Sequence, residues 1–145
     1  MHKEDSFMSD CIFCKIIDGE IPSAKIYEDE HVYAFLDISQ VTEGHTLVIP
    51  KNHKQDVFDL DEETASNLFK AVPKVANAIK AAYEPKGMNL LNNNGSFADQ
   101  SVFHIHLHLI PRYDENDGFK SNWSVGEQAS SEQLQEIAGK IKEHI

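Results

Sequence analysis

The sequence has no long apolar run, no cluster of basic residues and only two cysteines. None of its apolar stretches approaches the roughly 20 residues that a membrane-spanning helix needs. Lys and Arg number 13 against 24 Asp and Glu, so the formal net charge is −11. An acidic chain without a basic cluster is a poor match for a nucleic acid or an anionic membrane surface, although a few local donors can still hold a small phosphate ligand. We therefore expect neither a nucleic-acid partner nor a membrane partner.

Internal repeats, low-complexity stretches and long linkers are also missing from the 145 residues. A chain of this length can bury one proper core, so we expect a single domain over residues 11–145. Residues 1–10 are charged and are expected to form a flexible tail. They lack the apolar segment of a signal peptide, so we expect a cytoplasmic protein.

Apolar segments bounded by polar turns predict strands over residues 25–28, 32–36, 46–50 and 88–91. The first two strands surround a short polar turn, which is typical of a hairpin. A main helix is expected after Asp61, because an acidic cap precedes apolar residues at three-to-four spacing. Pro73 falls inside that pattern and is expected to kink or split the helix.

The spacing Ser130-x-x-Gln133 resembles a capping box and predicts a final amphipathic helix. The apolar positions Leu134, Ile137 and Ile141 follow it at helical spacing. Strands joined by hairpins, with helices on one face, indicate an α+β domain with an antiparallel sheet of about five strands.

The fifth strand is expected between Gln100 and Pro111, where three histidines alternate with apolar residues. The side-chain period of two places His104, His106 and His108 on one face. The other face carries Phe103, Ile105, Leu107 and Leu109, which suits a core. Imidazole is neutral near pH 7 and can act as a nucleophile, a general acid or a metal ligand. The strand is therefore either a metal platform or a histidine nucleophile with helpers, rather than an ordinary polar surface.

Cys11 and Cys14 form a C-x-x-C pair, which is typical of redox or metal sites. A redox pair normally opens a helix after a strand, and no strand is expected before Cys11. A structural zinc ion needs four ligands, so two histidines would have to join the thiolates. The candidates are His31, His45, His53 and the three histidines of the strand. A zinc site is the favoured interpretation.

Further polar residues each allow an ordinary and a functional interpretation. Asp37 follows a strand and is either a turn cap or a carboxylate that accepts ribose hydroxyls. His45 is either a surface histidine or a site residue. Asn93, Gly95, Gln100 and Ser101 flank the histidine strand, where they form either a turn or a rim of donors for phosphate oxygens.

Taken together, these motifs resemble the histidine triad (HIT) family, in particular its Hint branch and the bacterial Hit proteins. His104-Ile-His106-Leu-His108-Leu-Ile110 has the form of the family motif. The resemblance covers about residues 11–113, in family order. It includes the segments at residues 11–17, 21–22, 27–29, 34–38, 44–51, 93–95 and 100–102.

The resemblance implies an α+β domain whose sheet continues across a homodimer. It implies binding of purine nucleoside monophosphates and hydrolysis at the α-phosphate of their conjugates, of the adenosine phosphoramidate type, through a nucleotidyl-histidine. Two alternatives stay open: a dinucleoside polyphosphate hydrolase, and a nucleotide-binding module with incidental activity.

Site residues follow from the resemblance position by position. His106 matches the nucleophile, His108 a neighbouring phosphate-binding histidine and His45 a histidine near the α-phosphate. Asp37 matches the ribose-binding carboxylate, and Ser101 is expected to assist departure of the leaving group. The base pocket is expected to be lined by Phe13, Ile16, Ile21, Phe35 and Ile38. The phosphate side is expected to be lined by Asn93, Gln100 and Ser101.

In zinc-containing relatives the C-x-x-C pair joins the first motif histidine and a histidine after the Ile-Pro strand. Here these ligands are Cys11, Cys14, His53 and His104, and the zinc is expected to be structural.

Two features depart from the family pattern. Asp99 stands where many Hint sequences carry glycine, and it places an extra carboxylate near the phosphate. The segment that contains Trp123 and the last helix does not match the eukaryotic tail, so no role transfers to it.

Overall fold

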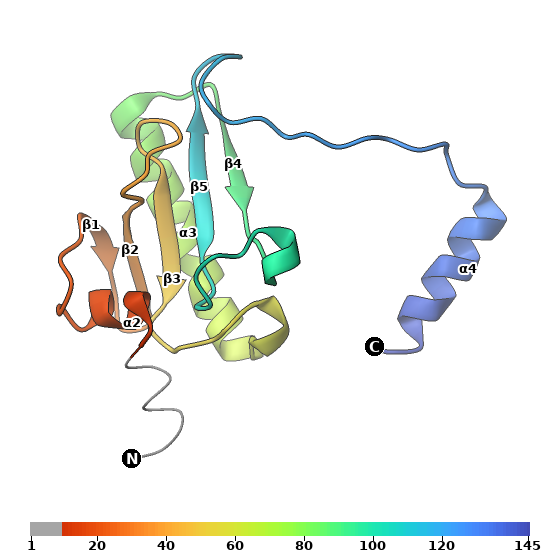
Figure 1. The fold of residues 1–145 in the computed structure, drawn as a ribbon, viewed down its shortest axis with the longest axis horizontal. Coiled ribbons are helices and arrows are strands. Elements are labelled where there is room, and N and C mark those ends of the chain that lie inside the picture. Colours follow the sequence, from red (N-terminus) through yellow and green to blue (C-terminus); the bar gives the residue numbers. More distant parts are fainter. Residues whose placement is uncertain (1–9) are drawn as a thin grey trace.

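The structure is a computed structural model that describes residues 10–145; most of the predicted tail, residues 1–9, lies outside the described part. Five strands form one antiparallel sheet in the order β1-β2-β3-β5-β4 (Figure 1). Their bounds are β1 Lys25–Glu28, β2 Val32–Leu36, β3 Thr46–Pro50, β4 Gly87–Leu91 and β5 Leu107–Arg112. The α+β class, the five strands and the β1–β2 hairpin are as predicted.

The central position of β5 holds the end of the histidine motif firmly. On one side His108 lies opposite Leu47 of β3, and on the other it lies opposite Leu91 of β4. A strand that is paired along both edges has its backbone polar groups satisfied and moves little. The His108 side chain therefore projects from a rigid platform.

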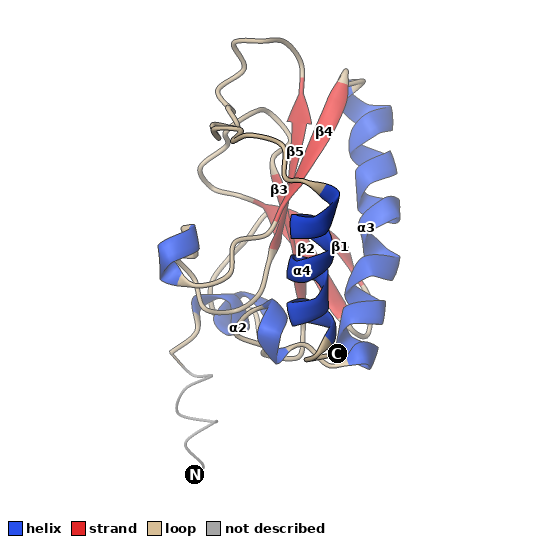
Figure 2. Ribbon diagram, turned by 90° about the vertical axis from the view of Figure 1, so that its right-hand side faces the viewer, coloured by secondary structure: helices blue, strands red, loops and turns tan. Residues whose placement is uncertain are grey.

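One face of the sheet is covered by α3, Glu62–Tyr83 (Figure 2). Its N-cap Asp61 accepts a hydrogen bond from the Thr64 amide, as its position predicted. The helix and the sheet share a buried core, to which α3 contributes Leu68, Ala71, Val72, Val75 and Ile79 and the sheet contributes Val32, Ala34, Val48, Leu107 and Leu109. The periodic apolar pattern thus identified the buried stripe of this helix correctly.

Of the kink or split expected at Pro73, the split does not occur, because α3 runs unbroken from Glu62 to Tyr83; the kink stays a prediction. Proline removes one amide donor and so leaves the Phe69 carbonyl without its usual partner. Pro73 is exposed and Phe69 is half exposed, so this carbonyl can be hydrated on the outer face of the helix. A proline on the solvent side is therefore tolerated in a helix that packing on the sheet holds together.

The opposite face of the sheet carries a second apolar cluster under the short helix α2, Ile12–Ile17. Phe13 and Ile16 of this helix pack with strand residues Tyr33, Phe35, Leu47 and Ile49. No helix was predicted here, because six residues are too few for a helical period to be visible. Cys11 caps the helix by accepting from the Cys14 amide.

The C-terminal segment leaves the sheet and ends in α4, Ser131–Lys142, which stands apart from the rest of the fold (Figure 1). Its predicted capping box is present, with reciprocal bonds between Ser130 and Gln133. The apolar positions Leu134, Ile137 and Ile141 are all more than half exposed. The sequence predicted the helix correctly, but no contact with the sheet covers its apolar face.

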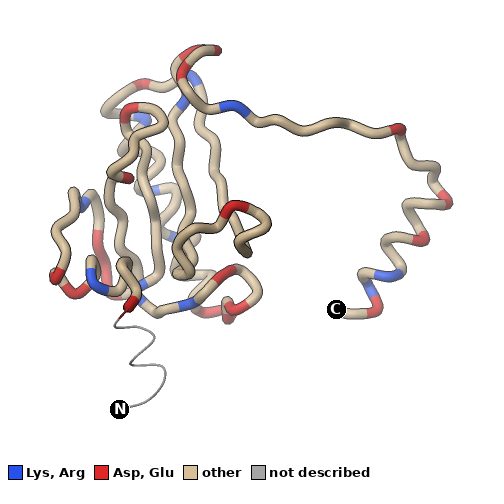
Figure 3. Tube along the Cα trace, in the orientation of Figure 1, with Lys and Arg blue, Asp and Glu red and all other residues tan. Residues whose placement is uncertain are grey.

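Two short 3-10 turns, Val57–Asp59 and Ser96–Ala98, lie in the loops near the site. Among the helices of residues 10–145, none is long and apolar enough to cross a bilayer. Lysine and arginine are scattered along the described chain and are outnumbered by acidic residues (Figure 3).

Candidate active site and metal cluster

The predicted histidine strand is a strand only from Leu107 onward. Residues 102–104 form a bend instead, and the Ile105 amide donates to the Lys54 carbonyl at 2.7 Å rather than to a neighbouring strand. Leu107 and Leu109 face the α3 core as predicted, whereas Phe103 is 39% exposed. His104 therefore lies outside the strand, although its ring and that of His106 both meet Phe13 edge-on, with centroids 5.8 and 5.1 Å apart.

His106 is buried, and its ring is held in one orientation. Its Nδ1 donates to the His104 carbonyl at 2.9 Å, because a carbonyl oxygen can only accept. In the neutral ring the lone pair is therefore on Nε2. Burial lowers the pKa of His106 and favours this neutral form. The ring thus presents a free lone pair, which is what a nucleophile requires.

Asn92 holds the backbone of His106. Its side-chain amide donates to the His106 carbonyl at 3.0 Å. The sequence gave no reason to choose Asn92 over its neighbours in the run Asn92–Asn94, and the prediction named Asn93 instead. Phe13 meets the His106 ring edge-on, with centroids 5.1 Å apart, and so restricts its tilt.

His45 and His108 form a hydrogen-bonded pair beside His106. The Val41 amide donates to His45 Nδ1 at 3.2 Å, so the neutral His45 ring carries its proton on Nε2. That Nε2 donates to His108 Nδ1 at 2.9 Å, which leaves the proton of His108 on its own Nε2. The rings of His106 and His108 lie 5.0 Å apart, centroid to centroid. A lone pair on His106 therefore lies near an N–H donor on His108.

Both members of this pair resist protonation. Burial lowers the pKa of His45, and burial together with the neighbouring rings of His106 and His45 lowers the pKa of His108 to about 4. A proton added to His45 Nδ1 would face the Val41 N–H, and one added to His108 Nδ1 would face the His45 Nε2–H, so two donors would oppose each other in either case. The pair is therefore neutral at pH 7, in agreement with the hydrogen-bond pattern.

Asp37 has the turn role that the sequence allowed, and its binding of ribose hydroxyls stays a prediction. Its Oδ1 accepts from the Ser39 amide at 2.8 Å, as a turn residue does. Its Oδ2 lies 3.6 Å from His45 Nε2, which is too long for a hydrogen bond but brings the carboxylate to the histidine pair. The second oxygen thus remains available to a hydroxyl-bearing ligand.

Asp37, His45 and His108 also bring three possible metal-ligand atoms within 4.8 Å of one another. A metal on His45 Nε2 would require the proton of this ring to be on Nδ1. The Val41 amide already points at that nitrogen, so the two donors would face each other. The hydrogen bonds of this group suit a proton network better than a cation.

The loop before the motif holds the remaining predicted polar residues. Asn93 reaches the Asp99 carbonyl at 3.5 Å. Gln100 is nearly buried, and its side chain bonds to the backbone of Gly95, Gln55 and Val102. The Gln100 side chain therefore braces the loop before the histidine motif. A contact between Gln100 and a phosphate would have to replace one of these three backbone bonds. The sequence prediction did not foresee this bracing role.

Ser101 is exposed and borders the metal cluster described below. It lines a cavity of about 370 Å³ with Asp10, Cys11, Ile12, His53, Val102 and Phe103. Its expected action at the reacting histidine stays a prediction. Asp99 adopts a left-handed backbone conformation with φ of 69° at the end of the Ser96–Ala98 turn, a position that favours glycine. A glycine at this position would adopt the same backbone conformation without strain.

Four of the five predicted base-pocket residues lie together. Phe13, Ile16 and Phe35 belong to the apolar cluster under α2, and Ile21 packs against it. Ile38 is fully exposed on the loop after Asp37 and lies outside that cluster. The structure therefore brings together an apolar wall next to His106, and Ile38 is not part of it here.

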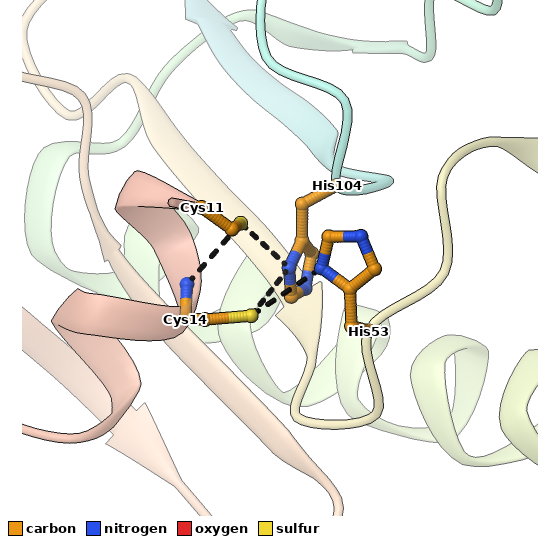
Figure 4. A group of neighbouring side chains, drawn as sticks. All are labelled: Cys11, Cys14, His53 and His104. Atoms are coloured by element: carbon orange, nitrogen blue, oxygen red, sulfur yellow. Dashed lines mark hydrogen bonds between the residues drawn. The ribbon is translucent and has the colours of Figure 1, made fainter. Parts of the chain in front are cut away.

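The predicted metal ligands Cys11, Cys14, His53 and His104 converge from three parts of the chain: α2 with its N-cap, the loop after β3 and the bend before β5 (Figure 4). His104 Nδ1 lies 3.4 Å from Cys11 Sγ and 3.6 Å from Cys14 Sγ, and His53 Nδ1 lies 3.3 Å from Cys14 Sγ. A tetrahedral zinc ion with bonds of about 2.0–2.3 Å places its ligand atoms about 3.5 Å apart. The observed separations fit that tetrahedron, so this cluster could hold a metal ion.

The protonation of the cluster is consistent with a metal site. His104 Nε2 donates to the Pro50 carbonyl at 2.8 Å, which leaves the lone pair on Nδ1, facing the sulfurs. Burial and the neighbouring Cys11 raise the pKa of the Cys14 thiol to about 12. Without a cation, the second thiolate is therefore costly at this position.

Comparisons with known proteins identify the family of this chain. A sequence profile of the HIT domain matches residues 18–115. "Protein hit" of Bacillus subtilis is 57% identical over 136 residues, which cover 93% of this chain and 94% of that protein. The chain belongs to the HIT family. A crystal structure of a HIT family member from Bacillus subtilis covers 94% of this chain and 97% of that chain with a TM-score of 0.91.

Two further members of the family carry informative names. The adenosine 5'-monophosphoramidase of Candida albicans is 40% identical over 139 residues, which cover 93% of this chain and 91% of that protein. A zinc-bound histidine triad family protein from Mycobacterium smegmatis is 34% identical and covers 95% of this chain and 99% of that chain, with a TM-score of 0.71.

The histidine pair predicts a specific loss of stability in acid. The folded-state pKa of His108 lies below the unfolded value near 6.5, so its contribution is present above pH 6.5 and is lost as the pH falls toward 4. We expect His108→Asn to flatten the fall of the melting temperature between pH 6.5 and 4.5. The exposed His31 provides the control, since His31→Asn should keep the wild-type slope. If the melting temperature fell equally with pH in the wild type, His108→Asn and His31→Asn, the lowered pKa of His108 would be contradicted.

Proposed function

We propose that the protein hydrolyses purine nucleoside phosphoramidates of the AMP-amine type through a nucleotidyl-His106 intermediate. The observation that carries the proposal is the free Nε2 lone pair of His106 beside the N–H donor of His108. The name of the Candida albicans relative, an adenosine 5'-monophosphoramidase, supports the choice of bond.

In the first step His106 Nε2 attacks the α-phosphorus in line with the leaving amine. A P–N bond forms to the ring as the P–N bond to the amine breaks. The attacked ring gains positive charge, and its Nδ1–H bond to the His104 carbonyl stabilises that charge. The amine departs after its nitrogen takes up a proton from solvent, which the Ser101 hydroxyl can pass on because it regains the proton that it gives. Neutral His108 keeps its Nε2 proton and assists departure as a hydrogen-bond donor. The proton returns to solvent when water attacks in the second step.

The phosphoryl oxygens gain negative charge in the transition state. The His108 ring lies 5.0 Å from the His106 ring, centroid to centroid, and the hydrogen bond from His45 fixes the orientation of its N–H. Donors that need no reorientation contribute most to stabilising developing charge. Water then attacks the nucleotidyl-histidine, which releases the nucleoside monophosphate and restores neutral His106.

The nucleoside part of the substrate is assigned to the residues around this centre. We assign the ribose hydroxyls to Asp37 Oδ2, whose other oxygen is already held by the Ser39 amide. The apolar wall that contains Phe13 and Phe35 is assigned to the base. Asn93 and Ser101 are assigned to the phosphate side, with Gln100 bracing their loop.

Replacing the proposed nucleophile should abolish turnover without unfolding the protein. We expect His106→Ala to lower kcat for an adenosine phosphoramidate by several orders of magnitude, because no other side chain offers a free lone pair at this place. AMP binding, measured by calorimetry, should largely survive. Mass spectrometry of wild-type enzyme quenched during turnover should find the nucleotide on His106, and an adduct on another residue would overturn the mechanism. Faster turnover of dinucleoside polyphosphates would instead favour the hydrolase alternative.

We further propose that the cluster of Cys11, Cys14, His53 and His104 holds one structural zinc ion per chain. All four positions are filled by protein ligands, which leaves none open for substrate. The ion would tie α2 and the loop at His53 to the bend at His104. The zinc-bound relative from Mycobacterium smegmatis supports the choice of metal.

Metal analysis tests this site directly. Protein purified without a chelator should contain about one zinc per chain, and Cys14→Ser should reduce that content and lower the melting temperature. His31→Ala, which alters an exposed histidine outside the cluster, should change neither. Zinc-free wild-type protein with an unchanged melting temperature would contradict the proposal.

We also propose a homodimer in which the edge strand β4 of each chain meets its partner. β4 ends the strand order, and its Leu90 is half exposed, so an apolar edge is left uncovered in one chain. The C-terminal segment runs out on the side of β4 and leaves α4 beyond this edge (Figure 1). A copy paired through β4 would lie where it can cover the apolar face of α4. The Bacillus subtilis structure matches almost the whole chain, which supports a similar path of the C-terminal segment in that relative.

Sedimentation tests the dimer and the role of α4. The protein should be dimeric at micromolar concentration, and Ile137→Glu should weaken the dimer about tenfold or more by placing a charge on the apolar face. Gln135 lies on the same helix but off that face, so Gln135→Glu should leave association unchanged. A monomeric wild-type protein, or equal effects of the two changes, would contradict this arrangement.

A further inference from the structure

The loop between β2 and β3, residues 37–45, carries Asp37 at one end and His45 at the other. Within this loop a single side chain bonds to both ends. Gln40 Nε2 donates to the Asp37 carbonyl at 2.6 Å and to the His45 carbonyl at 2.7 Å. Gln40 Oε1 accepts from the Gly44 amide at 2.8 Å and from the His45 amide at 3.2 Å. The carboxamide therefore uses both of its protons and both of its lone pairs on the loop backbone.

The four bonds hold the loop backbone on both sides of the Val41 amide. Val41 follows Gln40 directly, and its N–H is the group that donates to His45 Nδ1. That bond places the His45 proton on Nε2, which in turn donates to His108 Nδ1. The proton of His108 is thereby left on its Nε2, the position from which it can reach the substrate. Gln40 stands at the start of this series of donors and acceptors, without contact to the reacting atoms.

We infer that Gln40 is a positioning residue that selects the tautomers of His45 and His108 for the reaction. The inference rests on the proposed function for its catalytic consequence, but the tautomers themselves are properties of the free protein. If the loop opened, the His45 proton could move to Nδ1. His45 Nε2 would then carry a lone pair, and His108 would move its own proton to Nδ1 in order to donate to it. His108 Nε2 would lose its proton, so the substrate side would have no N–H from this ring.

The chemistry of the bonds makes the requirement for an amide specific. A glutamate at position 40 would have nearly the same shape, but it would place an acceptor against the carbonyls of Asp37 and His45. It would also add a negative charge close to the Asp37 carboxylate. A methionine would fill the same space with neither donors nor acceptors. Shape alone therefore cannot replace the carboxamide.

The first test is made on the unaltered, zinc-loaded protein. Long-range proton–nitrogen NMR of the histidine rings distinguishes a protonated Nε2 from a protonated Nδ1. We expect His45 and His108 each to show a single Nε2–H tautomer at pH 7.5. A proton on Nδ1 of His45 would overturn the inference whether or not the protein hydrolyses phosphoramidates. This measurement also needs no variant that folds.

The second test compares Gln40→Met and Gln40→Glu with Ser39→Ala. The neighbouring Ser39 is on the same loop, but its hydroxyl takes no part in the bonds described above. We expect both Gln40 variants to lower kcat for an adenosine phosphoramidate by about tenfold or more, with mixed tautomers at His45. Ser39→Ala should retain the wild-type kcat and spectrum.

A purely structural role for Gln40 predicts a different result. The melting temperature would fall while the folded fraction kept the wild-type kcat and a single His45 tautomer, and that outcome would refute the inference. If the wild-type protein lacked phosphoramidase activity but showed the expected tautomers, the proposed function would fail and the assignment of the hydrogen-bond series would stand.

Discussion

The peptide group of His104 is the constraint on which the site depends. Its carbonyl accepts from His106 Nδ1 and so leaves the reactive lone pair on Nε2. The ring of the same residue is held by the Pro50 carbonyl and faces two cysteine sulfurs. Any displacement of the His104 backbone would therefore disturb the metal cluster and the orientation of His106 together. The proposed structural metal site and the proposed catalytic site thus share one residue.

The two faces of the sheet divide the remaining tasks. One face packs on α3 through a buried apolar layer, which holds the strands in register. The other face carries the smaller cluster around Phe13 and Phe35, and the histidines lie beside it. Because β5 is paired on both edges, His108 cannot shift without breaking two ladders. The packed layer thus lies behind these histidines, and side-chain amides of Gln40 and Gln100 brace the loops around them.

Much of this arrangement could be predicted from local pattern. The apolar period of α3, the cap at Asp61 and the capping box at Ser130 depend on neighbouring residues only, and the structure confirms all three. Of the kink or split expected at Pro73, the split does not occur, because local propensity ignores both the packing of the helix on the sheet and the exposure of the freed carbonyl. The straight histidine strand was also wrong in its first half, because a contact between Ile105 and distant Lys54 replaces strand pairing. Interactions between residues far apart in sequence overrode the local preference in each case.

The sequence by itself determined the chemical groups: three histidines at alternate positions, a pair of cysteines and an aspartate after a strand. These residues also sufficed to suggest the family, since motif spacing is a local property. Only the tertiary structure decided the protonation of each ring, because a tautomer depends on the partner that the other nitrogen meets. Those partners are a carbonyl two residues away for His106, an amide four residues away for His45, and His45 itself for His108. No sequence periodicity predicts such contacts. The same holds for the side-chain amides of Asn92, Gln40 and Gln100, because only the fold brings them to the backbone groups that they brace.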